Sequence, residues 1–344
     1  VLGSGATDKT SGRPFRLVDG EIGSDITDIA RRHNDWNKHI INRTTLIFTQ
    51  DGIYPDPKPL SNQSIDKPPS HLDMGGEWVR LRFKTLYQDT DSCKTMIENH
   101  DEAESKVRPF TPDDIYSCAN ILTKILNDSF DEFVQTTLGV PKNEFFRVKP
   151  DAFYARYFQW GVKKRYAYVD FDGKHGFRGV EMRRSSSPKV VKSCQERLFK
   201  SILDGDSKTD VNRLIRDIEA DMLDPTQISD GDFGQPMGVK KEGTQAHRAA
   251  MWSNKNLDTS FSLGDKPVMF LASSTKNGLP TNRLVAIEWG DDPADFGIVV
   301  DRSGAIEKFF VNSNSFKQIL GAMGTSWESA RAGMSQSSMG DWFN

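Results

Sequence analysis

Two aspartates close together in the chain, Asp89 and Asp91, are the clearest candidates for chemistry. They end a stretch, from Trp78 onward, in which apolar and polar residues alternate as they do in a strand with one buried face. Because side chains two residues apart in a strand project from the same face, the two carboxylates are expected to point at one spot. Mg²⁺ bound to nucleotide phosphates takes few protein ligands and prefers carboxylate oxygens. The pair is therefore a candidate magnesium site at the end of a strand.

The spacing of this pair does not identify a metal site by itself. Three other aspartate pairs have the same spacing, and each fits a turn better than a strand end: Asp170/Asp172, Asp204/Asp206 and Asp230/Asp232. The six histidines do not pair at the spacing of metal ligands, and no Ser–His–acid arrangement can be argued from the sequence. A metal site at Asp89 and Asp91 therefore depends on the residues around the pair.

A second group of residues has the composition of a nucleic-acid surface. Lys163, Lys164 and Arg165 lie in a predicted strand region, and six aromatic residues interleave with them: Tyr154, Tyr157, Phe158, Trp160, Tyr166 and Tyr168. Because side chains alternate faces in a strand, part of the basic group should face solvent, where phosphate contacts give salt-dependent affinity that ignores base sequence. A solvated charged face is the simpler interpretation of the charges, and ordinary sheet core is the simpler interpretation of most of the aromatic residues.

These candidates need strands and helices to position them. The periodicity predicts a helix over residues 25–41, a Pro-rich surface loop over 51–70, and a helix that starts at Thr111-Pro112-Asp113-Asp114, where a cap, a proline and acidic residues coincide. The other predicted elements are short strands over 153–160, 165–171 and 177–182 and helices over 188–203, 211–222 and 246–256.

The composition fits a soluble protein of two modest domains. The chain has 344 residues, of which 36% are hydrophobic and 27% charged, and its net charge is −3. Its longest apolar stretches, such as residues 268–272, fall far short of the roughly 20 residues of a membrane helix, so no membrane partner is expected. The N-terminal sequence lacks the basic and apolar regions of a secretory signal. Three scattered cysteines, Cys93, Cys118 and Cys194, favour a reducing compartment, and a cytoplasmic location is predicted.

The residues around the aspartate pair add a resemblance to a known family. The segment Tyr87-Gln88-Asp89-Thr90-Asp91-Ser92 resembles the Tyr-x-Asp-Thr-Asp-Ser hairpin motif of family B DNA polymerases of the archaeal and viral type. In that family the second aspartate, here Asp91, binds the catalytic metals directly, and the first, here Asp89, supports the site. The resemblance implies a two-metal Mg²⁺ site that stabilises the attacking 3′ oxygen and the departing pyrophosphate.

Two further segments resemble elements of the same family in the same order. Gly161-Val162-Lys163-Lys164-Arg165-Tyr166 is similar to a Lys-Lys-Arg-Tyr motif that lies against the minor groove and backbone of the primer–template end. Gly179-Val180-Glu181-Met182-Arg183-Arg184 is similar to a Gly-x-Glu strand that runs into paired arginines. The chain departs from the family at Ser185-Ser186-Ser187, where an aspartate is usual. The residues that the resemblance implies for DNA binding are Lys163, Lys164, Arg165, Tyr166, Arg183 and Arg184.

The resemblance also implies an architecture. It predicts an α+β protein in which residues 1–186 are the C-terminal half of a polymerase palm, an antiparallel sheet with helices, and residues 187–330 are a mainly helical thumb. Residues 43–77 are longer than the usual connection and are expected to be an insertion loop. The segment at Val1 resembles the one that follows the nucleotide-binding Asn-Ser-x-Tyr-Gly helix motif. The fingers, the exonuclease domain and the rest of the active site are therefore expected on an N-terminal polymerase half.

The C-terminal residues match a peptide pattern of another kind. Residues 331–344 are predicted to be a flexible tail, and its sequence fits the Gln-x-x-aliphatic-x-x-aromatic-aromatic pattern of sliding-clamp-binding peptides. An aliphatic and two aromatic side chains on one short turn form a compact apolar plug. The residues expected to bind a sliding clamp are Gln336, Met339, Trp342 and Phe343.

Two functions of different classes follow from the sequence. The first is an enzyme part: the palm and thumb portion of a DNA-directed DNA polymerase, a nucleotidyltransferase that adds dNTPs to the 3′ end of a primer–template. The second is a non-catalytic DNA-binding and clamp-tethering subunit, or a relic of a polymerase. The Asp-Thr-Asp sequence favours the enzyme, since a tether has no chemical reason to keep two carboxylates at a strand end.

Overall fold

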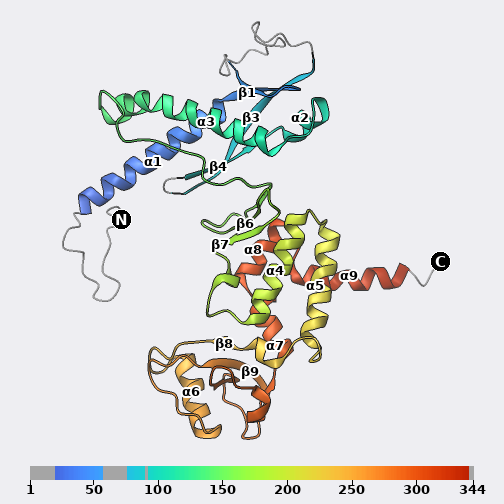
Figure 1. The fold of residues 1–344 in the computed structure, drawn as a ribbon. Coiled ribbons are helices and arrows are strands. Elements are labelled where there is room, and N and C mark those ends of the chain that lie inside the picture. The colour runs from blue at the N-terminus through green and yellow to red at the C-terminus, as the bar shows by residue number, and fades with distance from the viewer. Residues whose placement is uncertain (1–19, 57–75, 90–91, 341–344) are drawn as a thin grey trace. The chain divides into compact units, whose positions relative to one another are not determined.

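The computed structural model of the protein describes residues 20–56, 76–89 and 92–340, with only the backbone described at 20–27 and 334–340. The chain forms two compact units, unit 1 up to Phe153 and unit 2 from Tyr154. Each unit combines helices with antiparallel sheet (Figure 1). The predicted α+β class is therefore confirmed. The predicted palm and thumb domains meet at residue 186, whereas the two compact units meet at residue 153. The identification of palm and thumb stays a prediction.

Unit 1 is built on a four-stranded antiparallel sheet in the order β2-β1-β3-β4. One of its two inner strands, β1, is buried along its whole length and pairs Leu46 with Leu81 and Phe48 with Val79 of β3. β1 and β2 fall within residues 43–77, which the sequence suggested as an insertion loop; the Thr-Leu-Ile-Phe-Thr sequence of β1 has the β-branched and aromatic residues that favour a strand. The strands are β1 (Thr45–Thr49), β2 (Ile53–Pro55), β3 (Trp78–Asp89) and β4 (Ser92–Ile97).

Helices pack against this sheet. α3 begins as predicted, because the Thr111 side chain accepts a hydrogen bond from the Asp114 backbone N–H while the Asp114 carboxylate accepts one from the Thr111 backbone N–H. The core of unit 1 joins Phe48 and Leu81 of the sheet to Phe130 and Phe133 of α3, all four of them buried. The helical segments are α1 (Gly20–Arg43), α2 (His100–Lys106), α3 (Pro112–Phe133) and a π-helical turn, η1 (Val134–Leu138).

Unit 2 begins with a three-stranded antiparallel sheet, β5-β6-β7, which packs on α4. Ala167 pairs with both Phe158 and Phe177, and these side chains lie on the sheet face that shares a core with Phe199 of α4. The three predicted strands therefore exist, although each is shorter than predicted. They are β5 (Arg156–Phe158), β6 (Tyr166–Val169) and β7 (His175–Arg178), followed by the 3₁₀ turn η2 (Glu181–Arg183).

Helices form most of the rest of unit 2. Phe310, Phe316 and Trp327 are buried together and pack their rings at centroid distances of 4.9 to 6.0 Å. The helices around this core are α4 (Lys189–Asp204), α5 (Lys208–Leu223), α7 (Arg302–Ile306), η5 (Glu307–Val311), α8 (Asn314–Ala322) and α9 (Trp327–Gly340).

A second sheet lies within residues 187–330, where the sequence predicts a mainly helical part. Its central strand β9 pairs with β8, β10 and β11, all antiparallel, and α6 packs on β10. The elements are η3 (Asp230–Phe233), β8 (Gln235–Pro236), α6 (Gln245–Asn256), β9 (Val268–Ser274), β10 (Leu284–Ile287), η4 (Pro293–Phe296) and β11 (Val299–Val300).

The C-terminal helix α9 includes the start of the predicted tail. Its backbone is helical to Gly340, so Gln336 and Met339 lie in a helix, whereas the sequence predicts a flexible segment from residue 331. Trp342 and Phe343 lie outside the described residues. Neither α9 nor any other helix in the described ranges combines the length and apolar character that crossing a bilayer requires.

Candidate carboxylate hairpin and nucleic-acid interface

The structure places the first candidate carboxylate at the end of β3, as predicted. Asp89 is half-buried and pairs with Ser92, the first residue of β4, so the two strands form a hairpin. Asp91 lies outside the described residues. The expectation that the two carboxylates point at one spot therefore stays a prediction.

The alternation of side chains along β3 is interrupted before it reaches Asp89. Thr85 pairs with Thr95 of β4 but Tyr87 pairs with Lys94, so Leu86 is an extra residue, a β-bulge. Leu81 and Phe83 before the bulge face the core, and Leu86 itself is 44% exposed. The alternation predicted from Arg80 to Thr85 is therefore confirmed, and it ends at the bulge.

Asp170 and Asp172 lie in a turn, as predicted, whereas Asp204 ends α4 and Asp230 and Asp232 lie in the 3₁₀ helix η3. Asp170 Oδ1 accepts hydrogen bonds from the backbone N–H groups of Asp172 and Lys174, at 3.1 and 2.8 Å, and so closes its own turn. Asp206 accepts a hydrogen bond from Ser201, and Asp230 forms an ion pair with Arg302. Among the residues that the structure describes, no three His, Cys, Asp or Glu side chains gather as a metal site.

The predicted Lys163–Arg165 strand is a turn. The backbone turns at Gly161, whose φ is 77°, and at Lys164, whose φ is 64°, and Arg165 N–H closes a turn by donating to Val162 C=O over 3.4 Å. Strands require negative φ, so the predicted alternation of faces is wrong here. Lys163 and Lys164 are exposed because they lie in this turn, and the strand begins only at Tyr166.

A close backbone contact brings this turn beside the second predicted DNA-binding segment. Gly179 follows β7 with φ 65°, and a Cβ placed on it would lie 2.2 Å from the carbonyl oxygen of Lys164. In addition, Tyr166 of β6 pairs directly with Arg178 of β7. Only glycine permits both this φ and this approach, so Gly179 joins the two basic segments.

The arginine pair is fixed through its backbone. Met182 N–H donates to Gln195 Oε1 over 2.9 Å, and Gln195 of α4 is fully buried. Arg183 and Arg184 follow directly and are exposed. Lys266, from the loop before β9, brings its Nζ within 3.5 Å of Ser185 Oγ. Sequence reasoning missed Arg178, because it belongs to no motif and joins these residues only through strand pairing with Tyr166.

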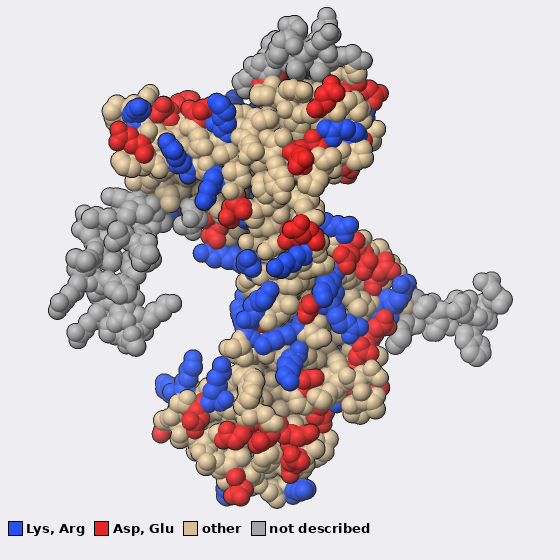
Figure 2. All heavy atoms as spheres, viewed as in Figure 1, with Lys and Arg blue, Asp and Glu red and all other residues tan. Residues whose placement is uncertain are grey.

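We call the basic cluster the six side chains Lys163, Lys164, Arg165, Arg178, Arg183 and Arg184. Figure 2 shows Lys and Arg gathered over the part of unit 2 that contains the β5–β7 sheet. Within the described part of the chain, five of the six make no ion pair; Lys164 has a further interaction. By contrast, Lys189 nearby in sequence pairs with Asp232 at 3.5 Å. The positive charge of the cluster is therefore largely uncompensated by acidic neighbours.

Four tyrosines cover the sheet face that turns away from α4. Tyr154 and Tyr168 lie 4.2 Å apart between ring centroids, and Tyr157 and Tyr166 lie 5.3 Å apart. All four are half-buried, and the Arg178 guanidinium lies 5.9 Å from the Tyr168 ring. The sheet-core interpretation is confirmed for Trp160 and Phe158, which contact Phe199, and is wrong for these tyrosines. In the sequence, the alternation of Tyr166 and Tyr168 with Ala167 and Val169 was the signal that these tyrosines lie on the face opposite the core.

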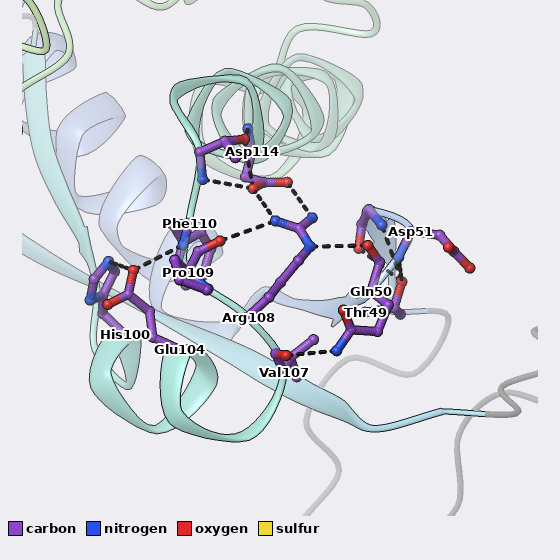
Figure 3. A network of polar contacts seen from close by, with 12 residues as sticks. Thr49, Gln50, Asp51, His100, Glu104, Val107, Arg108, Pro109, Phe110 and Asp114 are labelled. Carbon is purple, nitrogen blue, oxygen red and sulfur yellow. Dashed lines mark hydrogen bonds and ion pairs between the residues drawn. The ribbon is translucent and has the colours of Figure 1, made fainter.

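Unit 1 also contains a charged group, the Arg108 network, but its charges are paired (Figure 3). Arg108 donates from Nη1 and Nη2 to the two oxygens of Asp114, at 2.7 and 2.9 Å, and from Nε to Gln50 C=O at 3.0 Å. The hydrogen bonds from Arg108 to Asp114 hold the pKa of Asp114 down to about 2, with burial opposing the effect and the Thr111 hydrogen bonds adding to it. The network joins α3 to the β1–β2 turn and engages both oxygens of Asp114.

Comparison with known proteins adds no family. No protein-family model matches the sequence, and no curated protein matches it. The function therefore has to be argued from the basic cluster, the tyrosine face and the Asp89 hairpin.

Proposed function

We propose that this chain is the palm and thumb part of a DNA-directed DNA polymerase and that the basic cluster binds primer–template DNA. The observation that supports this proposal best is the basic cluster itself. Six basic side chains from two separate segments are held together by Gly179, and those from Arg183 and Arg184 extend from a backbone fixed by Gln195. Lys163, Arg165, Arg178, Arg183 and Arg184 make no ion pair among the described residues, whereas a structural ion-pair network would bring acids to them, as happens at Arg108.

The chemistry of the cluster suits a duplex of any sequence. Each phosphate that a lysine or arginine neutralises releases bound counterions, which gives affinity that falls with salt and does not depend on base sequence. The tyrosine face lies on the same sheet, and aromatic rings beside basic side chains are typical of nucleic-acid surfaces. A polymerase must bind every sequence that it copies, so its DNA-binding surface needs affinity that does not depend on base sequence.

The Asp89 hairpin supports the catalytic part of the proposal. Asp89 and Asp91 would hold Mg²⁺, which neutralises phosphate charge during nucleotidyl transfer. The strand end is a suitable position, because half-buried Asp89 is close to solvent yet fixed by its pairing with Ser92. An N-terminal polymerase half would supply the dNTP-binding residues. The proposal also includes a role in DNA replication in the cytoplasm. There a sliding clamp would be bound by Gln336, Met339, Trp342 and Phe343.

Binding of a primer–template by the full chain tests the first part. We expect the Lys163→Ala/Lys164→Ala variant to bind several-fold more weakly on all sequences. The slope of log affinity against log salt should fall by about one for each phosphate that the variant no longer neutralises. The matched control is Lys106→Ala/Lys124→Ala, which removes two exposed lysines that pair with acids in unit 1. Equal salt slopes for the wild type and the cluster variant would contradict the proposal.

Primer extension tests the second part. We expect Mg²⁺-dependent extension when the chain is mixed with a polypeptide that supplies the N-terminal half, and its loss in Asp91→Asn with DNA binding unchanged. Near-normal incorporation by Asp91→Asn would rule out the assigned metal site.

The alternative function is a non-catalytic DNA-binding and clamp-tethering subunit. It is favoured by the fact that the basic cluster lies entirely in unit 2 while Asp89 belongs to unit 1. Salt-sensitive binding without extension in any mixture would select it.

A further inference from the structure

The last residues of β3 are attached to α1 by side chains rather than by the sheet alone. Gln88 Nε2 donates a hydrogen bond to the backbone carbonyl of Asn34 in α1, and lies 3.5 Å from Sγ of Cys93, its partner across the hairpin. A helix carbonyl has a second lone pair, so Asn34 can accept this bond without losing its place in α1. Gln88 therefore anchors the hairpin to the helix one residue before Asp89.

A second attachment lies at the bulge. The backbone N–H of Thr85 donates to Asn42 Oδ1 of α1 over 2.9 Å. A β-bulge disrupts the ladder where the extra residue enters, so the groups beside it need other partners. α1 supplies one such partner, the Asn42 side chain. Two turns earlier in the same helix, the Asn34 carbonyl accepts the hydrogen bond from Gln88. α1 therefore makes side-chain hydrogen bonds with β3 on both sides of the bulge.

The bulge decides which way the end of the strand faces. Odd-numbered residues before the bulge, such as Leu81 and Phe83, point to the core that α1 helps to cover. After the extra residue Leu86, the even-numbered Gln88 points to α1. Because neighbouring residues in a strand point to opposite faces, Asp89 is turned away from α1. Without the bulge, Asp89 would share the face of Leu81 and Phe83.

We propose that Gln88 is a positioning residue: its hydrogen bond to α1, together with the Leu86 bulge, fixes the face on which Asp89 presents its carboxylate. The hydrogen bond serves the hairpin whether or not the chain is a polymerase; its effect on catalysis rests on the proposed function. Gln88 does not touch a substrate in this role, since its amide is directed to Asn34 and Cys93.

Amide hydrogen exchange tests the anchor directly. We expect Gln88→Leu to speed exchange at Tyr87–Asp89 and Ser92–Lys94 roughly ten-fold, the effect of losing one partly buried hydrogen bond. Asn42→Ala, which removes the acceptor at the bulge, should have a smaller effect in the same segment. The matched control is Gln50→Leu, which removes another Gln side-chain bond to a backbone carbonyl in unit 1, that of Val107. Exchange in Gln88→Leu equal to that of the wild type would overturn the proposal.

Primer extension by the mixture with the N-terminal half tests the catalytic consequence. In Gln88→Leu we expect kcat to fall roughly ten-fold and the Mg²⁺ concentration for half-maximal rate to rise, while KM for primer–template stays within about two-fold. Faster exchange with an unchanged kcat would overturn the positioning role. If the wild-type mixture does not extend primers, the polymerase proposal fails, and the exchange data alone decide whether Gln88 fixes the hairpin.

Discussion

The Arg108 network of unit 1 and the basic cluster of unit 2 are both held firmly, but their charges are used differently. Arg108 is surrounded by acceptors, and its charge is opposed by Asp114. In the basic cluster the fixed part is the backbone, held by Gly179 and Gln195, while the side chains other than half-buried Arg165 are exposed. A paired charge stabilises the fold, and a positioned charge without an acidic partner remains available to a ligand. Substitutions should therefore change stability in unit 1 and affinity in unit 2.

The largest effect should come from the backbone that holds the basic cluster. Gly179→Ala forces a Cβ against the Lys164 carbonyl, so the two segments must separate, at a cost of about 4 kcal/mol in the free energy of unfolding and with weaker DNA binding. Gly173→Ala is the control, because Gly173 also has positive φ, 77°, but has open space around it. It should cost only about 1 kcal/mol. Urea denaturation measures both, and equal costs would show that the close contact is unimportant.

In unit 1 the next largest effect should come from breaking the paired charge. Asp114→Asn removes the bidentate partner of Arg108 and weakens the cap of α3, so we expect the free energy of unfolding to fall by about 3 kcal/mol. Asp113→Asn is the control, because Asp113 occupies the same helical turn and is exposed. DNA affinity should not change in either variant. A loss of DNA affinity in Asp114→Asn would show that the Arg108 network is not purely structural and also contributes to DNA binding.

Acid should act on the same network. The pKa of Asp114 is lowered from 3.8 to about 2, so its contribution to stability is fully present above pH 3.8 and is lost as the pH falls toward 2. The difference corresponds to about 2 kcal/mol. We expect Arg108→Met to flatten the dependence of unfolding free energy on pH over this range. Identical slopes in variant and wild type would mean that Arg108 does not set the pKa of Asp114.

The smallest effect on stability should come from the exposed ends of the basic cluster. Arg183→Ala and Arg184→Ala remove side chains without an ion pair among the described residues, so the free energy of unfolding should stay within about 0.5 kcal/mol. Each should nevertheless weaken primer–template binding and reduce its salt dependence. A stability loss of several kcal/mol would show that these charges are structural after all, as at Arg108.

Local sequence signals predicted the elements that depend on neighbouring residues. Thr111, Pro112 and Asp114 define the start of α3 by themselves, because the cap needs only groups within one turn. The strand that ends at Asp89 was visible in its alternation, and the short strands of the β5–β7 sheet in their aromatic residues. The α+β class follows from these elements together.

Features that depend on distant partners could not be predicted. The Leu86 bulge is defined by its register against β4, a strand that the sequence alone does not align with β3. Lys164 adopts positive φ, which lysine rarely does, because Gly179 packs against its carbonyl. The sequence therefore indicated the residues of the basic cluster other than Arg178, but not the backbone contact that assembles it.

The core shared by the β5–β7 sheet and α4 limits how the chain can be divided for experiments. Trp160 and Phe177 pack on Phe199 at centroid distances of 5.1 and 5.7 Å. A fragment that starts at residue 187 would lose both partners and expose the Phe199 ring to water, which favours aggregation. A fragment that starts at Tyr154 keeps the ring covered. The smallest piece suited to crystallisation or isotope labelling therefore contains the sheet and the helices together.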